Sequence, residues 1–211
     1  MCFSKEVSLI TFIVGFISSV LCFLSDSPTY KILGLFFINV VMVQLTEYLL
    51  WGHPQCDDYN KKLSMIQMII INLQPIVLFM AVLYYNKSLN DKTHKRLALL
   101  YTTVIVYLLV IVNYFLNAVK EIGCDVREEE HKPLDWKWTN YQNTGFIYLF
   151  FAVVISIIGY YGLPSLNTPF AVIAVVSYLT SGLIYGNKYS GTMWCFIGAL
   201  LPNLLLISKL N

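Results

Sequence analysis

Charge is scarce in this chain. Only 12% of its 211 residues are charged and 57% are hydrophobic, whereas soluble domains carry about 25% charged residues. A soluble fold is therefore excluded, and the net charge of +2 offers no basic stripe for a nucleic acid. The apolar residues form continuous runs and do not alternate with polar ones, which favours membrane-spanning helices over a β-barrel.

Histidine is rare as well. The three histidines, His53, His94 and His131, lie between the apolar runs, so the chain lacks the intramembrane zinc ligands of ceramidase-type hydrolases. A zinc site outside the membrane, built from cysteines with His53 or His131, has no CxxC or HExxH spacing to support it. The mid-helix lysine of a retinal protein is missing too, since Lys209 lies at the end of the last run. We expect no metal and no cofactor, and we favour a protein that is not an enzyme.

Seven apolar runs have roughly the 20 residues that a helix needs to cross a membrane. They cover residues 7–24, 30–51, 63–85, 97–118, 145–162, 169–186 and 191–208. The first run has no basic segment before it and no clear cleavage site, so we interpret it as a helix of the mature protein and not as a signal peptide. We predict one all-α domain over residues 1–211, an integral membrane bundle of seven helices.

The basic residues predict an orientation, because short cytoplasmic loops collect Lys and Arg. The short connection 86–96 holds Lys87, Lys92, Lys95 and Arg96. The other end of the helices has Lys61 and Lys62 in one loop and a longer, mixed segment, 120–138, and a long loop counts less than a short one. This places the N-terminus on the external or lumenal side and the C-terminus in the cytoplasm.

Four of the five cysteines, Cys2, Cys56, Cys124 and Cys195, fall on the outer side in this topology. Disulfides persist in oxidising compartments, so Cys56 could pair with Cys124 and Cys2 with Cys195. Four cysteines allow three pairings, however, and unpaired thiols that pack as small apolar residues are an equal alternative.

The apolar run 30–51 contains one carboxyl group, that of Glu47, with no basic residue near it. Such a group costs about 2.5 to 3.5 kcal/mol at the centre of a membrane helix and usually faces the protein interior. Gln44 and Trp51 lie one turn to either side and share its helix face. Burial disfavours the charged form of a carboxyl, so Glu47 could exchange a proton during transport or bind a cation. Alternatively, it joins helices as a neutral hydrogen-bonding group.

Other polar side chains could line the same cavity as Glu47. Gln67 and Gln74 share one face of the third run, and Gln67 lies at a depth that would allow a hydrogen bond to Glu47. Trp194 and Asn203 come from the last run. We therefore predict one outer cavity lined by the first, second, third and seventh helices. The tryptophans near the outer interface, Trp51, Trp136, Trp138 and Trp194, are expected to be interface anchors, with Trp51 and Trp194 also available as cavity walls.

Two segments indicate an internal repeat. Residues 45–52 (Leu-Thr-Glu-Tyr-Leu-Leu-Trp-Gly) and 179–186 (Leu-Thr-Ser-Gly-Leu-Ile-Tyr-Gly) match in part, and the helix after each contains a proline, Pro75 or Pro202. Parallel three-helix repeats joined by the fourth helix would be similar in architecture to the SWEET, PQ-loop and KDEL-receptor proteins. Chance similarity between apolar helices is the alternative.

Three short patches resemble an uncharacterised family of bacterial and large-DNA-virus membrane proteins. They are residues 1–4 (Met-Cys-Phe-Ser), 44–51 (Gln-x-x-Glu-x-x-x-Trp) and 194–196 (Trp-Cys-Phe). The resemblance implies no particular reaction, but it singles out six residues: Cys2, Gln44, Glu47, Trp51, Trp194 and Cys195.

The sequence thus predicts a multi-pass protein of the lipid bilayer that acts as a transporter or channel for a small solute or ion, with a cavity at Glu47. A second hypothesis is a membrane scaffold or receptor-like binding protein in which Glu47 is structural. A third is a membrane enzyme that uses the outer thiols. These hypotheses differ in whether a change at Glu47 or at a cysteine abolishes activity.

Overall fold

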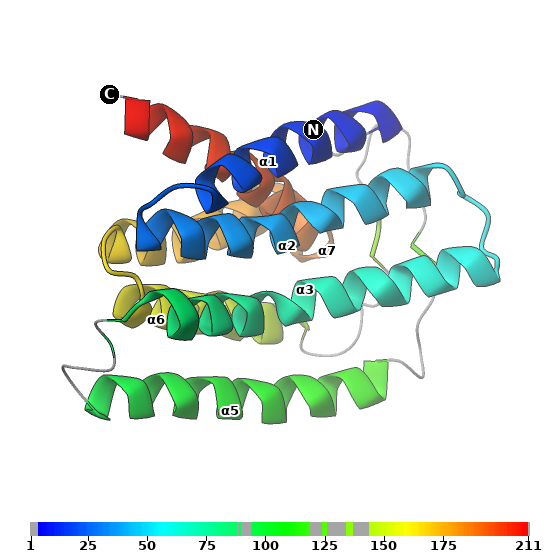
Figure 1. The fold of residues 1–211 in the computed structure, drawn as a ribbon. Coiled ribbons are helices and arrows are strands. Elements are labelled where there is room, and N and C mark those ends of the chain that lie inside the picture. Colours follow the sequence, from blue (N-terminus) through cyan, green and yellow to red (C-terminus); the bar gives the residue numbers. More distant parts are fainter. Residues whose placement is uncertain are drawn as a thin grey trace.

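The computed structural model describes residues 4–87, 89, 94–118, 124–125, 134–136 and 144–210. Its main helices are α1 (Lys5–Phe23), α2 (Pro28–Trp51), α3 (Asp58–Tyr85), α5 (His94–Ala118), α6 (Thr144–Gly162) and α7 (Asn167–Leu210) (Figure 1). Seven helical stretches of the described chain are long and apolar enough to cross a membrane, because α7 contains two of them, Asn167–Gly186 and Tyr189–Ile207. The predicted all-helical, multi-pass membrane architecture is confirmed at this level.

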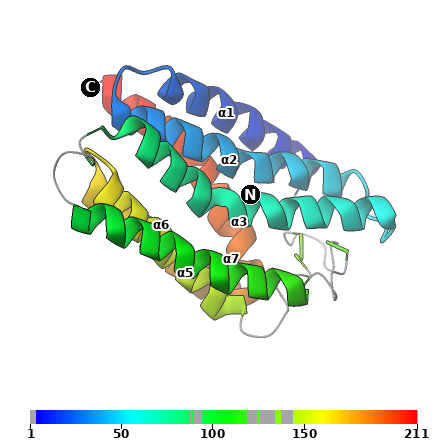
Figure 2. The same cartoon turned by 60° about the horizontal axis from the view of Figure 1, so that its bottom comes forward.

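The helices lie side by side, with α2 near the centre. α2 contacts α1, α3 and α7, while α5 contacts α3 and α6. α1 and α5 lie on opposite sides of the assembly (Figures 1 and 2). In the apolar stretch of α2, 61% of the residues are buried inside the protein, against 28% in α5. A polar side chain on α2 is therefore more shielded from lipid than one on α5.

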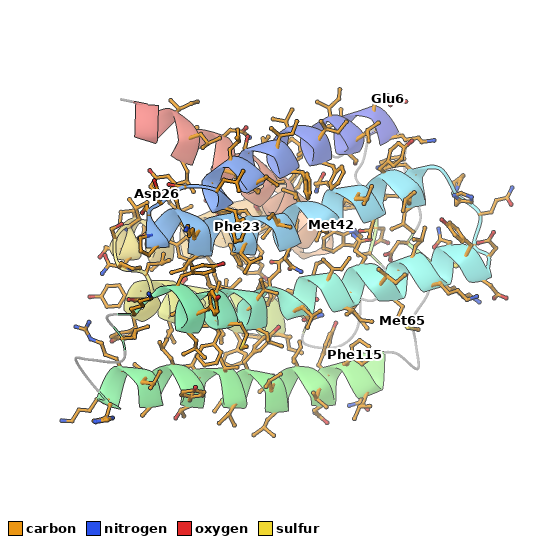
Figure 3. The ribbon with its side chains drawn as sticks, viewed as in Figure 1. Glu6, Phe23, Asp26, Met42, Met65 and Phe115 are labelled. Atoms are coloured by element: carbon orange, nitrogen blue, oxygen red, sulfur yellow. A yellow bond between two sulfur atoms is a disulfide. The ribbon has the colours of Figure 1, made fainter. Side chains whose placement is uncertain are left out.

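Charged groups mark the two ends of the first helix. Glu6 lies at its start and Asp26 just beyond its end, at opposite sides of the molecule (Figure 3). Capping extends some helices past the apolar runs. α3 begins at Asp58, five residues before the predicted span, because the Asp57 carboxylate accepts a 2.8 Å hydrogen bond from the backbone N–H of Asn60. A search for long apolar runs does not detect polar first turns of this kind.

α7 folds back on itself at Gly186. The backbone there has φ 72° and ψ 170°, a conformation that glycine adopts without strain. The Trp194 indole N–H donates a 2.8 Å hydrogen bond to the Ser177 hydroxyl, although residues 17 positions apart on a straight helix would be about 25 Å apart. The sixth and seventh spans therefore form an antiparallel hairpin whose arms touch.

Small side chains bring α1 close to its neighbours. A Cβ atom on Gly34 of α2 would fall 2.7 Å from the Phe23 Cα, and one on Gly15 of α1 would fall 2.5 Å from the Ala199 carbonyl oxygen. Such close backbone approach is a common basis of helix association in membranes. It places the second arm of α7 against both α1 and α2. Pro75 and Pro202 lie inside α3 and α7, and the internal repeat remains a prediction.

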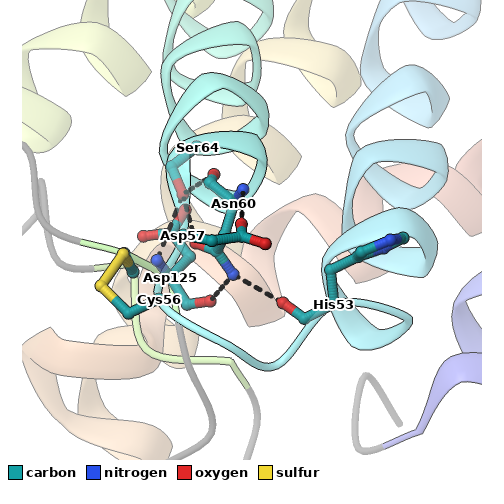
Figure 4. The surroundings of a disulfide bond; sticks show 7 residues. His53, Cys56, Asp57, Asn60, Ser64 and Asp125 are labelled. Atoms are coloured by element: carbon teal, nitrogen blue, oxygen red, sulfur yellow. Dashed lines mark hydrogen bonds between the residues drawn. A yellow bond between two sulfur atoms is a disulfide. The ribbon is translucent and has the colours of Figure 1, made fainter.

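A disulfide joins two connections at one end of the helices (Figure 4). Cys56, between α2 and α3, is bonded to Cys124. Beside it, the Asn60 side-chain amide donates to the carbonyl oxygens of His53 and Asp125, at 2.8 and 3.1 Å. The covalent bond and these hydrogen bonds fix the start of α3 to the segment that follows α5.

Candidate functional site

Glu47 is fully buried in α2. Its exposed fraction and that of Gln44, one turn earlier, are both 0%. The spacing of three residues puts both side chains on one helix face, and α1, α3 and α7 pack around this helix. The carboxyl therefore points into the protein and not into lipid, as expected for an ionisable group at membrane depth.

Three candidate functional side chains lie close together where α2, α3 and α7 meet. The Cys195 thiol of α7 is close enough to interact electrostatically with the Glu47 carboxyl, and the Gln74 side chain of α3 lies beside the same thiol. Cys195 is 4% exposed and Gln74 2% exposed. We call these three residues the Glu47 cluster. The cluster combines an ionisable carboxyl, an amide and a thiol, all of them buried.

Further polar groups extend this cluster toward α5 and α6. The Tyr107 hydroxyl of α5 donates a 2.9 Å hydrogen bond to the backbone carbonyl of Asn72 in α3. The Tyr148 hydroxyl of α6 lies beside the Asn72 side chain and within electrostatic range of Cys195. Sequence reasoning missed both tyrosines, because tyrosine in an apolar run usually marks the membrane interface. The position of Tyr107 in the middle of its run was the signal that could have identified it.

A pocket borders the Glu47 cluster; its empty space, counted together with its open mouth, is about 430 Å³. Gln74, Ser177, Trp194 and Cys195 supply its polar groups. Its remaining walls are apolar or glycine and come from α2, α6 and both arms of α7: Phe36, Phe37, Val40, Ile155, Phe170, Ile173, Ala174, Gly198 and Leu201.

The pocket differs in place and composition from the predicted cavity. Glu47 is not one of its lining residues; Cys195 and Gln74 connect it to the carboxyl. α6 and the first arm of α7 contribute walls that sequence reasoning did not assign. The predicted wall Trp194 does line the pocket, and its ring packs against Phe151 and Tyr178.

Three other predicted site residues, Gln67, Asn203 and Trp51, do not line the pocket. Gln67 is fully buried, but its side-chain amide has no hydrogen-bond partner among the described residues, so the expected bond to Glu47 is not formed. The carboxyl is instead placed near Cys195 of α7. The Asn203 side chain accepts a 2.5 Å hydrogen bond from Ser18 of α1, which makes it a helix-joining residue. Trp51 is partly buried and does not line the pocket.

The tryptophan of the segment before α6 is also placed differently from expectation. Trp136 is only 1% exposed, and its ring lies so close to Gly191 that a Cβ atom there would fall 2.9 Å from it. Trp136 is therefore packed in the protein and is not an interface anchor. Trp138 lies outside the described residues.

The cysteines divide into two groups. The pairing of Cys56 with Cys124, one of the two considered from the sequence, is present. Cys195 carries a buried free thiol, so its pairing with Cys2 and its role as an outer reactive thiol are wrong. Its helix turns it inward, toward Glu47. Cys2 itself lies outside the described residues.

Among the residues that the structure describes, no three His, Cys, Asp or Glu side chains gather closely enough to hold a metal ion. Comparison with known protein families, with curated proteins and with solved structures finds no match for this chain. The functional argument therefore rests on the geometry of the Glu47 cluster and its pocket.

Proposed function

We propose that this protein is a transporter or channel-like protein that binds a small solute in the pocket beside the Glu47 cluster. The observation that carries the proposal is the contact of Cys195 and Gln74 with both the pocket and the neighbourhood of the carboxyl. Intramembrane carboxyls next to cavities are typical of proton- or ion-coupled transport. A solute in this pocket would lie next to groups that respond to the charge of Glu47.

The backbone next to the pocket favours movement. Pro75 directly follows Gln74 inside α3, and Pro202 directly follows the lining residue Leu201 inside α7. Each proline lacks a backbone N–H and removes one helical hydrogen bond. Helices interrupted near a binding site are a common feature of secondary transporters, and bending at these two points would change access to the pocket.

We also propose that the N-terminus faces the external or lumenal side. The disulfide lies between α2 and α3, at the same end of the helices as the start of α1 (Figure 1). Disulfides form in oxidising compartments. The basic residues Lys87, Lys95 and Arg96, at the end of α3 and the start of α5, lie at the opposite end of the helices, which supports a cytoplasmic side there.

A scaffold role is the second candidate, and one observation favours it. Glu47 is completely buried and does not line the pocket, which is the arrangement of a residue that joins helices. In that case the pocket would be a packing defect, and the charge of Glu47 would have no effect on flux.

The test uses purified protein in liposomes that contain a pH-sensitive dye. With an inside-negative potential imposed by a potassium gradient and valinomycin, the native protein should admit protons faster than empty liposomes. Glu47→Gln removes the ionisable proton and keeps the shape, so it should reduce this proton uptake at least tenfold. Glu6→Gln, at the exposed start of α1, is the matched control and should leave the uptake unchanged.

Folding is checked by the thermal unfolding midpoint of each variant. If Glu47→Gln unfolds like the native protein and conducts protons equally well, Glu47 has no transport role. If neither protein exceeds empty liposomes and only the midpoint changes, the scaffold role is supported.

A further inference from the structure

A second pocket adjoins the one beside the Glu47 cluster. That second pocket, with about 550 Å³ of empty space, is lined by Leu33, Phe37, Leu166, Pro169, Phe170, Ile173, Leu201, Leu204 and Leu205. It shares Phe37, Phe170, Ile173 and Leu201 with the first. Because they share these walls, the two pockets adjoin along α2 and the α7 hairpin, and we refer to them together as the groove. Between Trp194 and Leu205 the groove follows α7 for about 16 Å, which is the dimension of a hydrocarbon chain and not of an ion.

The groove opens toward the bilayer. Ile173 and Leu204 line it and are 44% and 61% exposed on the protein surface. Both belong to stretches of α7 that can cross a membrane, so the surface around the opening meets lipid and not water. A ligand could therefore enter sideways from the bilayer, and the driving force would be burial of its apolar chain.

The inner end of the groove offers one hydrogen-bond donor. The Trp194 N–H is bonded to Ser177, and the Ser177 hydroxyl donates to the Ile173 carbonyl at 2.6 Å. Gln74 differs: it is 2% exposed and lines the pocket, and among the described residues the acceptor beside its amide nitrogen is the Cys195 sulfur. The Cys195 sulfur beside it is only a weak acceptor. A buried donor in this state favours a ligand with an acceptor oxygen.

The lining of the groove and the nearby Glu47 carboxyl select against anionic ligands. None of the described residues that line either pocket is charged. A carboxylate or phosphate would find no lysine or arginine there and would lie near the Glu47 carboxyl. Burial of such an anion without a partner is costly.

We propose that the groove binds an uncharged, single-chain amphiphile from the bilayer, with its oxygen at Gln74 and its hydrocarbon chain along Phe37, Phe170 and Leu201. This deepens the proposed transport function, since it names the class of solute that the same pocket takes. A long-chain alcohol has the required chemistry: one neutral acceptor oxygen and one apolar chain.

The test is photolabelling of the full chain in nanodiscs. The probes are a long-chain alcohol with a diazirine in its chain and the carboxylic acid and primary amine of equal length. The alcohol should label α2 and α7 peptides saturably, and unlabelled alcohol should compete. The acid should label the same peptides at least tenfold less efficiently. Equal labelling by all three probes, or labelling that does not saturate, would show simple partitioning into lipid and overturn the proposal.

Two variant pairs locate the binding mode. Gln74→Leu removes the donor and should raise the alcohol concentration at half-saturation about fivefold. Gln67→Leu, on the same helix face but outside the pocket, should leave this concentration unchanged. Ala174→Phe fills the pocket and should abolish saturable labelling, whereas Val176→Phe, on the lipid-exposed surface of the same arm, should preserve it. If Gln74→Leu and Ala174→Phe are both labelled like the native protein, the alcohol binds elsewhere and the assignment is rejected.

The result is separable from the transport test. Saturable labelling without Glu47-dependent proton uptake would support the groove as a binding site and reject transport. Proton uptake that depends on Glu47, with no saturable labelling, would support transport and reject this class of ligand. An acyl chain of a resident phospholipid would appear as co-purified lipid that the alcohol fails to displace, which also rejects the proposal.

Discussion

Single polar residues on otherwise apolar helices hold this protein together. Tyr107 is 1% exposed in the middle of α5, and its hydroxyl reaches the backbone of α3 at Asn72. Asn72 in turn donates from its side-chain amide to the Met68 carbonyl at 2.8 Å. A hydroxyl inside the membrane has no water as an alternative partner, so the bond also fixes the rotation of α5.

Tyr107→Phe removes this interhelical hydrogen bond and changes little else. The free energy of unfolding in detergent should fall by about 0.6 kcal/mol and by no more than about 1.7 kcal/mol, the range found for membrane hydrogen bonds. Tyr101→Phe is the matched control, because Tyr101 is on the same helix and 45% exposed. Equal losses in the two variants would show that the hydroxyl of Tyr107 contributes nothing specific.

The sequence identified some site residues by their polarity and could not locate others. Glu47, Gln44 and Gln74 stand out because such side chains are expensive in an apolar run. Cys195 does not, since a thiol is compatible with lipid, protein interior or solvent. Which helix faces the carboxyl depends on rotation and packing, and no single side chain encodes these. For this reason the sequence predicted a hydrogen bond from Gln67 to Glu47, which is absent, and did not predict that Cys195 lies near the carboxyl.

At the scale of elements, the α7 hairpin decides where the pocket lies. Hydrophobic length alone predicted both of its arms, with ends that differ by two residues at most. It did not predict that the chain reverses at Gly186 so tightly that Ser177 and Trp194 are hydrogen-bonded. Two of the pocket's walls exist only because these arms are antiparallel neighbours.

Gly186→Ala should destabilise this hairpin. A side chain at φ 72° and ψ 170° is strained by about 1 to 3 kcal/mol, so the thermal unfolding midpoint should fall. Gly182→Ala, four residues earlier in the same arm, meets open space at its Cβ position and should match or exceed the native midpoint. A Gly186→Ala protein as stable as Gly182→Ala would mean that the reversal does not need glycine.

For the whole molecule, seven helical stretches of the described chain are long and apolar enough to cross a membrane, and an odd number of crossings would put its two ends on opposite sides. The seven runs and the helical class were predictable because a bilayer imposes length and internal hydrogen bonding on any spanning segment. The order of helices around α2 was not, since lipid and protein interior are equally apolar and hydrophobicity cannot tell them apart.

The proposed orientation is tested by cysteine labelling in a Cys2→Ser background. Lys62 and Lys87 are exposed at opposite ends of α3. In right-side-out vesicles, a membrane-impermeant maleimide should modify Lys62→Cys directly and Lys87→Cys only after permeabilisation. The background should be low because Cys22 and Cys195 are buried and Cys56 is bonded to Cys124. The reverse pattern would invert the topology.

The bond between Cys56 and Cys124 closes a ring that contains α3 and α5, with 68 positions between its ends. α5 has lipid around much of its surface, with 28% of its apolar stretch buried. The position of α5 beside α3 and α6 therefore does not depend on side-chain packing alone, because the disulfide keeps the end of α5 tethered to the start of α3 if the helices separate transiently. Loss of this helix from its neighbours would require a reductant as well as thermal motion, and in the proposed orientation that reductant would have to act on the external or lumenal side.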